Sequence, residues 1–564
     1  MNEFELEIAR LVAEPAGLPV EEAARLIEVP PDDKLGDFAV PCFVLAKRLK
    51  QAPPAVAAAL ARRIRPTALV PEVRAAGPYL NFRVDAARFA RSVLGEVLRE
   101  DDAYGRSDEG AGKTVVIDYS SPNIAKPLAF HHIRSTMIGN ALRRIFRALG
   151  WRVVGINHLG DWGTQFGKLM VAYRRWGNGD PLTEEPILKL NELYVRFHEE
   201  VKQEPALADE ARAWFKKLED GDPEARRLWA WFRELSLKEF EQVYELLRVK
   251  FDEVTGESFF NEQIPAVLDE IARKGLSKES EGALVVEVGE KMPPCLLLKG
   301  DEATLYATRD IAAAMHRRRT WGFARNLYVV DQGQGLHFRQ FFKVLSMMGY
   351  DWARDCIHVA FGLVRFKDQK MGTRRGNVIL LLDVLQKSIA LARAIMEEKN
   401  PGLQDKERVA RQVGIGAIVF NDLKNGRLKD VNFDWEELLN FDGETGPYVQ
   451  YTHARIASVL RKAGAAPDPA APVERLALPD ERALIRLIEA YPGRVRLAAR
   501  DHEPSNVAGH LLETAGQFNR YYNAHRILEQ DPELRAARLL LIRAVMTVLR
   551  NGLDLLGVEA PEAM

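Results

Sequence analysis

Hydrophobic residues in the middle of the chain follow two spacings, one typical of buried strands and one typical of helices. Residues 114–117 are a short apolar run, and after a polar stretch the apolar positions recur every three or four residues from Met137 to Leu149. Gly150 follows and predicts the end of this helix. Residues 152–159 are the next apolar run. The order predicts strand, helix and strand, which is one unit of a parallel sheet.

A second unit of the same kind is predicted much later in the chain. Residues 326–331 and 357–364 have the pattern of strands, and residues 337–348 between them that of a helix ended by Gly349. Two such halves predict a doubly wound parallel sheet of the Rossmann type. The stretch between the halves, from residue 178 to about 300, is largely helical in pattern and charged, so we expect an insertion there.

The two ends of the chain have patterns of their own. Residues 1–110 combine helical patterns at 2–13 and 54–65 with an alternating strand pattern at 78–84. After about residue 400 a helical period runs through 406–462 and 480–556, and we expect no strand there. The fold class predicted is α/β multidomain: an N-terminal α/β domain at 1–110, a Rossmann-type sheet domain at 111–400 with a helical insertion at about 178–300, and an all-α C-terminal domain at 401–564.

Composition restricts the class of protein. A chain of 564 residues is too long for one core. The net charge of −1 gives no overall basic field, so any contact with nucleic acid needs local basic patches. Cys42, Cys295 and Cys356 are scattered, which argues against a zinc site or disulfides and favours the reducing cytoplasm. We expect neither a signal peptide nor a membrane span, because the N-terminus is acidic and no apolar run reaches 18 residues.

The polar stretch after the first strand carries the strongest candidate chemistry. Residues 118–136 have the sequence D-Y-S-S-P-N-I-A-K-P-L-A-F-H-H-I-R-S-T. A loop between a strand and a helix places backbone N–H groups at the positive end of the helix dipole, where anions bind. With the side chains of Asn123, Lys126, His131, His132 and Arg134, the stretch predicts a site for nucleotide phosphates. The alternative is a polar connection without a ligand, which is common in α/β proteins.

A second phosphate-binding loop is predicted after the strand that ends at residue 364. Residues 369–376 have the sequence Q-K-M-G-T-R-R-G. Basic side chains among glycines suit the charge that builds on a polyphosphate leaving group, although a solvated basic turn is an equal alternative for this motif alone. Two such loops on two halves of one sheet imply a nucleotide at the switch point between them.

Five stretches of sequence, in order along nearly the whole chain, resemble the arginyl-tRNA synthetases, a family of class I aminoacyl-tRNA synthetases. They are S-S-P-N-I-A-K-P at 120–127, N-H-L-G-D-W-G-T-Q-F-G-K-L at 157–169, Y-A-T-R-D-I at 306–311, Q-G-L-H-F at 334–338 and G-P-Y-V-Q-Y-T-H-A-R at 446–455. The resemblance implies an arginine–tRNA ligase. Such an enzyme activates L-arginine with ATP to arginyl-adenylate and transfers the arginyl group to the 3′ end of tRNA(Arg).

The resemblance places ATP on the two loops, which match the HIGH and KMSKS signatures of the class. The catalytic residues it implies are Lys126, His132, Lys370 and Arg374. The ATP-binding residues it implies are Pro122, Asn123, Ile124, Ala125, Lys126, Pro127, Leu128, Ala129, Phe130, His131, His132, Lys370, Met371, Gly372 and Thr373. We expect Mg²⁺ to arrive with ATP, and we expect no tightly bound metal or organic cofactor.

Recognition of arginine requires carboxylates and planar acceptors around a guanidinium. Tyr306 and Asp310 are four residues apart, so on a helix they lie on one side, where an ordinary surface pair is the alternative. The resemblance assigns these two residues, with Glu257, to the guanidinium. The full set of arginine-binding residues it implies is Asp118, Ser120, Asn123, Glu257, Tyr306, Asp310 and Gln334.

The C-terminal helical domain resembles the anticodon-binding domain of the family, and the N-terminal domain its additional tRNA-binding domain. Aromatic and amide side chains suited to unpaired bases are Tyr448, Tyr451, Tyr521, Tyr522 and Asn523. Basic clusters at 47–50 and 62–65 are candidates for holding the tRNA. The partners implied are tRNA(Arg), L-arginine and ATP, with no membrane, and the protein is expected to be a monomer.

The chain departs from the family at both signatures. Residues 129–132 align with HIGH but have Ala129 in place of the first His and His131 in place of Gly. The second loop has Thr373 in place of the second Lys. Two alternatives therefore stand beside an active ligase: a catalytically impaired paralogue that binds tRNA without charging it, and another class I nucleotidyl transferase for a small substrate.

Overall fold

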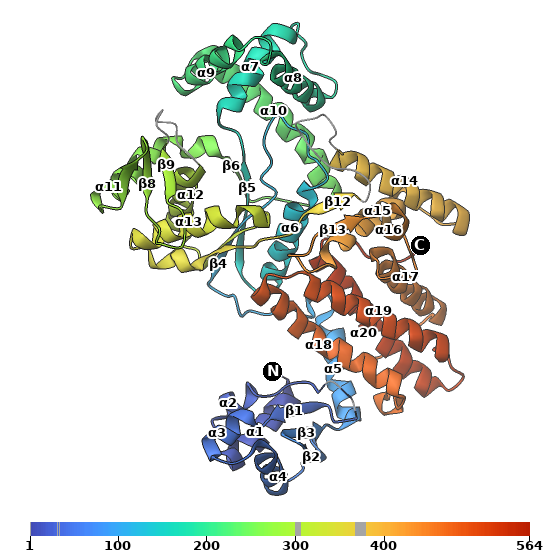
Figure 1. The fold of residues 1–564 in the computed structure, drawn as a ribbon. Helices are drawn as coiled ribbons and strands as arrows, with labels where there is room; N and C mark the ends of the chain where they lie inside the picture. The colour runs from blue at the N-terminus through green and yellow to red at the C-terminus, as the bar shows by residue number, and fades with distance from the viewer. Residues whose placement is uncertain (1, 31, 33, 299–305, 367–378) are drawn as a thin grey trace. The chain divides into compact units, whose positions relative to one another are not determined.

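The computed structural model describes residues 2–30, 32, 34–298, 306–366 and 379–564, which fall into two compact units (Figure 1). The first unit consists of Met1–Asp101, Ala463–Glu489 and Arg520–Val545. The second consists of Asp102–Lys462, Ala490–Asn519 and Met546–Met564. All residues predicted for arginine and ATP belong to the second unit.

The N-terminal part of the first unit is a three-stranded antiparallel sheet with helices, as the α/β pattern predicts. Its first helix begins with a capping box, in which Asn2 and Glu5 each accept from the backbone N–H of the other. The strands pair in the order β1-β3-β2. The elements are α1 (Glu3–Ala16), α2 (Val20–Ala24), β1 (Phe38–Pro41), α3 (Phe43–Leu49), α4 (Pro53–Arg63), β2 (Glu72–Ala76), β3 (Tyr79–Arg83) and α5 (Ala86–Glu100).

The second unit is built on a parallel sheet with the strand order of a Rossmann fold. Its strands are β4 (Thr114–Asp118), β5 (Arg152–Leu159), β6 (Glu253–Gly256), β10 (Arg325–Tyr328) and β11 (Cys356–His358). They lie in the order β11-β10-β4-β5-β6, and every neighbouring pair is parallel. The chain turns to one side after β4 and returns on the other side at β10, so the switch point lies between these two strands. The predicted fold class is confirmed.

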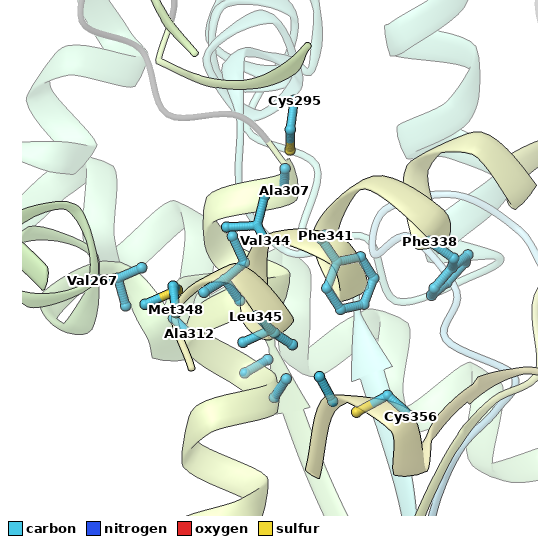
Figure 2. Packing of buried hydrophobic residues seen from close by; sticks show 14 of the residues in the cluster. Val267, Cys295, Ala307, Ala312, Phe338, Phe341, Val344, Leu345, Met348 and Cys356 are labelled. Atoms are coloured by element: carbon cyan, nitrogen blue, oxygen red, sulfur yellow. The ribbon is translucent and has the colours of Figure 1, made fainter. Parts of the chain in front are cut away.

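Helices α12 (Tyr306–Trp321) and α13 (Gly335–Met347) pack their apolar side chains into one core with the sheet. Val116 of β4 and Ile156 of β5 belong to this core. Figure 2 shows Ala312 of α12 close to Val344 and Leu345 of α13 and to Met348, which follows this helix. Every residue of β4 after Thr114 is buried, as expected for a central strand covered on both faces. Helix α6 (His132–Ala148) also packs against β4 and β5.

The long stretch between the halves is only partly helical. Helices α7 (Thr164–Trp176), α8 (Pro186–Glu200), α9 (Ala206–Glu219) and α10 (Pro223–Leu246) share a core of their own. The prediction of a largely helical stretch missed two features within it: β6 belongs to the main sheet, and an antiparallel sheet follows. Only Gly256 of β6 is buried, so this edge strand has no apolar run to reveal it. The later elements are η2 (Glu257–Gln263), α11 (Ile264–Arg273), β7 (Ser277–Ser280), β8 (Ala283–Val286) and β9 (Cys295–Leu298).

Two strand predictions are wrong. Residues 357–364 are not one strand, because β11 ends at His358 and β12 (Val364–Phe366) pairs instead with β13 (Val431–Phe433). The prediction of no strand after residue 400 is also wrong, because β13 lies there. A Cβ atom at Gly362 would lie 2.6 Å from the Lys429 carbonyl oxygen, so this glycine permits a close approach that no apolar period indicates.

The rest of the chain is helical. Among the described residues, none of the helices is both long enough and apolar enough to cross a membrane. The remaining elements are η1 (Asp101–Ala103), η3 (Gln332–Gln334), η4 (Asp351–Asp355), α14 (Leu381–Lys399), α15 (Lys406–Leu423), α16 (Trp435–Leu438), α17 (Gly446–Ala463), η6 (Val473–Arg475), α18 (Pro479–Asp501), α19 (Ser505–Ala524) and α20 (Pro532–Leu555).

Candidate active site

The polar residues predicted from the sequence gather at the carboxyl ends of the central strands. Ligands of doubly wound sheets bind at these ends, where the connections diverge to opposite sides. Asp118 is the last residue of β4, and His158 lies next to the last residue of the adjacent β5. Gln334 is exposed and ends η3, which follows β10 on the other side of β4.

Asp118 is buried and already binds a cation of the protein. Its Oδ2 accepts a hydrogen bond of 2.6 Å from Nη2 of Arg317, and its Oδ1 accepts one of 2.7 Å from the Ser121 hydroxyl. Burial works against the charge of Arg317, but the carboxylate of Asp118 holds the pKa of this guanidinium above its ordinary value. Any ammonium group that approached Asp118 would share the carboxylate with Arg317.

The turn after β4 is held in an uncommon backbone conformation by buried hydroxyl groups. Ser120 and Ser121 both have positive φ, 69° and 48°. The Ser120 hydroxyl accepts from the Thr136 hydroxyl at 2.9 Å and bonds to the Tyr244 hydroxyl at 2.9 Å. Ser120 is only 5% exposed. Helices α6 and α10 therefore fix the shape of the turn from two directions.

In residues 122–130, the next part of the loop, most side chains are buried. Pro122, Ile124, Ala125, Pro127, Leu128, Ala129 and Phe130 are all buried. Asn123 is exposed and forms an isolated bridge with Gly160, where a Cβ atom would lie 1.9 Å from its Oδ1. A side chain at position 160 would therefore displace the Asn123 amide from its present place. The Lys126 ammonium lies 5.3 Å from the centre of the Tyr194 ring, a cation–π contact with α8.

His132 is the first residue of α6 and is fixed by the loop. The Ala129 backbone N–H points at Nδ1 of the ring at 3.0 Å. Nδ1 also lies 3.0 Å from the Ala129 carbonyl oxygen, so the proton of the neutral ring is either on Nδ1, bonded to this oxygen, or on Nε2. Burial lowers the pKa of His132 to about 3, and the neighbouring His131 and Lys126 lower it further. The ring is therefore neutral at physiological pH and offers one N–H donor at the start of a helix.

His131 occupies the position next to it without a clash. Its ring lies 4.1 Å from that of His132, centre to centre, at an interplanar angle of 34°. Burial lowers the pKa of His131, and the carboxylate of Asp331 opposes this shift. The imidazole that replaces the family's glycine thus packs on the ring of His132 and interacts electrostatically with the carboxylate of Asp331.

A cluster of carboxylates lies at the ends of β5 and β6. Glu257 begins η2 directly after β6, with its Oε2 at 3.9 Å from Nη1 of Arg309. Asp310 of α12 is hydrogen-bonded through Oδ2 to Nε2 of His337 at 2.6 Å. Burial raises the pKa of Glu257 to about 8, with Asp310 and Asp161 adding to the effect and Arg309 opposing it. Tyr306, one turn before Asp310, is 65% exposed.

Several buried polar atoms around these carboxylates have no hydrogen-bond partner among the described residues. They are Oε2 of Glu257, Nδ1 of His158, and Nε and Nη1 of Arg317. Buried polar groups are nearly always paired in folded proteins, so such a group of orphans indicates a place for a polar ligand. His158 and His337 were not predicted from the sequence. Both lie within sequence stretches that carry the family resemblance, and this was the only signal available for them.

The prediction of one phosphate-binding residue is wrong, and the second predicted loop lies outside the described residues. Arg134 is buried away from the loop, with its Nε at 2.9 Å from Oδ1 of Asp422 and its Nη1 donating to the carbonyls of Gly362 and Lys429. It ties α6 to α15 and to the segment before β12. The second predicted loop, with Lys370, Met371, Gly372, Thr373, Arg374 and Arg375, lies outside the described residues.

The candidates for stacking on tRNA bases differ in exposure. Tyr521 is completely buried and donates a hydrogen bond from its hydroxyl to Glu481 at 3.1 Å, so its prediction as a base-stacking residue is wrong. Tyr451 and Tyr522 are 38% and 37% exposed. The Tyr451 ring lies 4.8 Å from the guanidinium of Arg455.

A Rossmann-type sheet with a helix-start loop after its first strand, a helical insertion and a helical C-terminal part define a class I aminoacyl-tRNA synthetase. Comparison with known proteins agrees along the whole chain. Residues 93–435 match the family described as "tRNA synthetases class I (R), catalytic domain", residues 449–564 the "DALR anticodon binding domain", and residues 2–84 the "Arginyl tRNA synthetase N terminal domain".

Whole-chain relatives identify the family within this class. The chain is 48% identical to an arginine–tRNA ligase of Alkaliphilus metalliredigens (strain QYMF), with 100% of both chains covered. It is 49% identical to "Arginine--tRNA ligase 2" of Bacillus anthracis, with 97% of both covered. Among solved structures, arginyl-tRNA synthetase of Thermus thermophilus matches with a TM-score of 0.81, 28% identity and 99% of both chains covered. The chain belongs to the arginyl-tRNA synthetase family.

Proposed function

We propose that the ends of β4, β5 and β10 form the site where this arginine–tRNA ligase joins arginine to ATP. The observation that carries the proposal is the unpaired Oε2 of buried Glu257, which lies close enough to the Asp310 carboxylate for the two charges to interact. A guanidinium is planar, carries five donors and would satisfy both carboxylates at once. We therefore place the end of the arginine side chain between Glu257, Asp310 and Tyr306.

The ligase reaction has two steps, and neither needs a nucleophile from the protein. In the first, a carboxylate oxygen of arginine attacks the α-phosphorus of ATP, and pyrophosphate leaves with the bonding electron pair. In the second, a hydroxyl of the terminal tRNA ribose attacks the carbonyl carbon of arginyl-adenylate, and AMP leaves while the hydroxyl proton is released. Positioning and electrostatic stabilisation therefore carry the catalysis.

The start of α6 is proposed to bind the phosphates of ATP. In the tautomer with its proton on Nε2, the neutral ring of His132 would donate to them, and the helix N-terminus adds a positive potential. Lys126, now on the Tyr194 ring, would supply a charge from the same loop. Lys370 and Arg374 are proposed for the leaving pyrophosphate. The described residues contain no cluster of three His, Cys, Asp or Glu side chains fit to hold a metal, so we propose that Mg²⁺ enters with the phosphates of ATP.

The loop after β4 is proposed to orient the amino and carboxylate end of arginine. Asn123 and Gln334 are exposed at this edge of the sheet and could reach it directly. Asp118 would act together with Arg317, whose Nη2 it binds at 2.6 Å. Ser120 would act through the backbone, because its hydroxyl is buried against Thr136 and Tyr244.

We also propose the organisation of the remaining molecule. Residues 1–110 and 401–564 would hold the tRNA and its anticodon, and residues 111–400 the chemistry. The enzyme is proposed to act as a cytoplasmic monomer. The three buried free cysteines, Cys42, Cys295 and Cys356, support the reducing compartment. Light scattering on the pure protein should then give a mass close to 63.6 kDa.

Exchange of Asp310 for Asn tests the arginine site. Asp310→Asn removes one carboxylate charge from the proposed guanidinium site and keeps its size. We expect the KM for arginine in tRNA charging to rise by more than about tenfold, the effect of roughly 1.4 kcal/mol of lost binding, with the KM for ATP within twofold of wild type. Asp269→Asn, at an exposed position of α11, is the matched control.

Three outcomes of this assay are informative. An unchanged KM for arginine in Asp310→Asn would show that the guanidinium of arginine binds outside this cluster of carboxylates. A wild-type enzyme that binds tRNA but does not charge it would instead support the catalytically impaired alternative. Charging with Ala129 and His131 in place would mean that the altered first signature is compatible with catalysis.

A further inference from the structure

A large basic cavity lies in the second unit, outside the residues assigned to arginine and ATP. Its volume is about 1240 Å³. Of its lining residues, seven are basic and three are acidic. The basic residues come from the C-terminal half of α6, from α10, from the segment after α10 and from the segment after η1. They include Arg106, Arg143, Arg144, Arg147, Arg248 and Lys250.

The positive charges of this cavity are only partly neutralised. Asp252 is shared by two arginines, since it lies 2.9 Å from Nη2 of Arg147 and 3.5 Å from Nε of Arg143. Asp554 is likewise shared by Arg144 at 3.0 Å and Arg248 at 3.7 Å. Two carboxylates are thus shared by four guanidinium groups, and these six groups together carry a net positive charge.

Of the other charges that line the cavity, Glu241 and Glu245 reduce this excess, whereas Arg106, Arg233 and Lys250 add to it. Among the described residues, no carboxylate lies within 4.0 Å of the basic groups of Arg106 or Lys250. Arg143 is 8% exposed, and its Nε has no hydrogen-bond acceptor among these residues. Burial lowers the pKa of Arg144, and the charges of Arg248 and Arg143 lower it further although Asp554 opposes them. A dianion in the cavity would relieve the repulsion between these guanidinium groups.

A second cavity adjoins this one, and its lining has three basic and three acidic residues. It has a volume of about 330 Å³, shares Arg106 and Arg248 with the first cavity and is also lined by Arg550. Pockets for small molecules usually have about 300–1,000 Å³, so the first cavity is larger than a single small anion requires. The several guanidinium groups of the first cavity suit more than one phosphate, because the planar guanidinium fork matches phosphate oxygens.

We propose that this basic cavity binds phosphate groups, with the tRNA backbone as their source. The proposal rests on the arginine–tRNA ligase function, which supplies a phosphodiester chain as substrate. The formal net charge of −1 means that the protein as a whole does not attract tRNA, so a local cluster of this kind is needed. The cavity would add a backbone contact that carries affinity but no sequence information.

The test is a double exchange of two exposed arginines, Arg106→Gln with Arg248→Gln. Neither residue belongs to the proposed arginine or ATP site. We expect the KM for tRNA to rise at least tenfold, and the plot of log affinity against log salt to become shallower by about 1.5, since each lost phosphate contact contributes roughly 0.7–0.9. The charging rate at saturating tRNA and the KM for arginine should stay within twofold of wild type.

A matched control separates this effect from a general loss of charge. Arg227→Gln with Arg411→Gln removes the same two charges from exposed positions of α10 and α15 that do not line the cavity. We expect its KM for tRNA to stay within twofold of wild type. Lys250→Gln, at an exposed lining position, provides a second variant if the double exchange lowers the melting temperature.

A second arm identifies the source of the phosphate. Inorganic tripolyphosphate is titrated by calorimetry into wild type, variant and control, with the ATP site saturated by a non-hydrolysable ATP analogue. Loss of tripolyphosphate binding in the variant with an unchanged KM for tRNA would keep the phosphate site but assign it to a free polyphosphate. If the variant matches the control in both measurements while the wild type charges tRNA normally, the cavity is not a phosphate site and the ligase function stands.

Discussion

At the scale of single residues, burial determines the charge of the His132 ring. Burial lowers the pKa of His132 to about 3, so the ring is neutral at physiological pH and carries one N–H donor. Its donor strength should therefore not change with pH.

His132→Ala should lower the rate of arginyl-adenylate formation by more than about tenfold, because a donor to the developing phosphate charge is lost. His132→Asn, whose amide can also donate, should recover part of the loss. ATP–pyrophosphate exchange at saturating tRNA measures both. Kinetics close to wild type in the Ala variant would remove His132 from the mechanism.

Glu257 gives the arginine site a pH dependence whose sign can be worked out. Its pKa of about 8 leaves the carboxyl mostly protonated at pH 7, whereas a bound guanidinium favours the ionised form. Binding below pH 8 therefore releases a proton. We expect the KM for arginine to fall as the pH rises from 6 to 8 and to level off above this range.

The control for this pH effect is Glu257→Gln, which cannot ionise. Its KM for arginine should be higher than that of wild type at pH 8.5 and nearly constant from pH 6 to 9, measured by charging at saturating ATP and tRNA. A wild-type KM that does not vary with pH would mean that Glu257 is not beside the guanidinium.

At the scale of elements, the buried ion pair of Arg134 and Asp422 joins α6 to α15. The two side chains are 1% and 5% exposed, and burial raises the pKa of Asp422 even though Arg134 opposes this. Arg134 also donates to the carbonyls of Gly362 and Lys429, which lie just before the paired strands β12 and β13. The pair therefore positions the strand that leads into the second signature loop.

Arg134→Met should destabilise the protein by about 3–5 kcal/mol, because it leaves a buried carboxylate without a partner. Arg393→Met is the matched control, since its ion pair with Glu407 is 60% and 68% exposed and should contribute less than about 1 kcal/mol. Melting curves of the two variants should differ clearly. Equal melting temperatures would show that the carboxylate is relieved in another way, for example by protonation.

The elements that hydrophobic spacing predicted are those whose apolar positions form a recognisable run or period along the chain. The strand, helix and strand from β4 to β5 have long apolar patterns, and the helix after β10 was predicted as well. Short elements held by contacts distant in sequence were missed: β6 is an exposed edge strand, and β12 and β13 pair across more than sixty residues of chain. Period-based reasoning cannot detect a strand of three or four residues whose partner is elsewhere.

At the scale of the whole molecule, the near-zero net charge makes tRNA binding depend on local patches. Lys47 and Lys50 are exposed on and just after α3 of the N-terminal domain, a proposed contact with the tRNA. Lys47→Glu with Lys50→Glu should raise the KM for tRNA and reduce its salt dependence, by roughly 0.7–0.9 in log–log slope for each lost phosphate contact. The KM for arginine should not change.

The control for this exchange is Lys202→Glu with Lys216→Glu, two lysines of the helical insertion that are 69% and 68% exposed. Charging assays between about 50 and 200 mM salt, the range over which phosphate contacts lose most affinity, measure the slope. A double variant of α3 that behaves as this control does would exclude these two lysines from the tRNA contact.

The sequence by itself determined the fold class, the family and the loop that opens the site, because long apolar periods and ordered motifs are properties of the chain alone. Only the tertiary structure decided which polar residues are buried against partners within the protein. Arg134 and Tyr521 have suitable chemistry but are buried against Asp422 and Glu481. His158 and His337 join the site from other strands and helices. Burial and pairing depend on residues far apart in the chain, and these decide whether a side chain is available for chemistry.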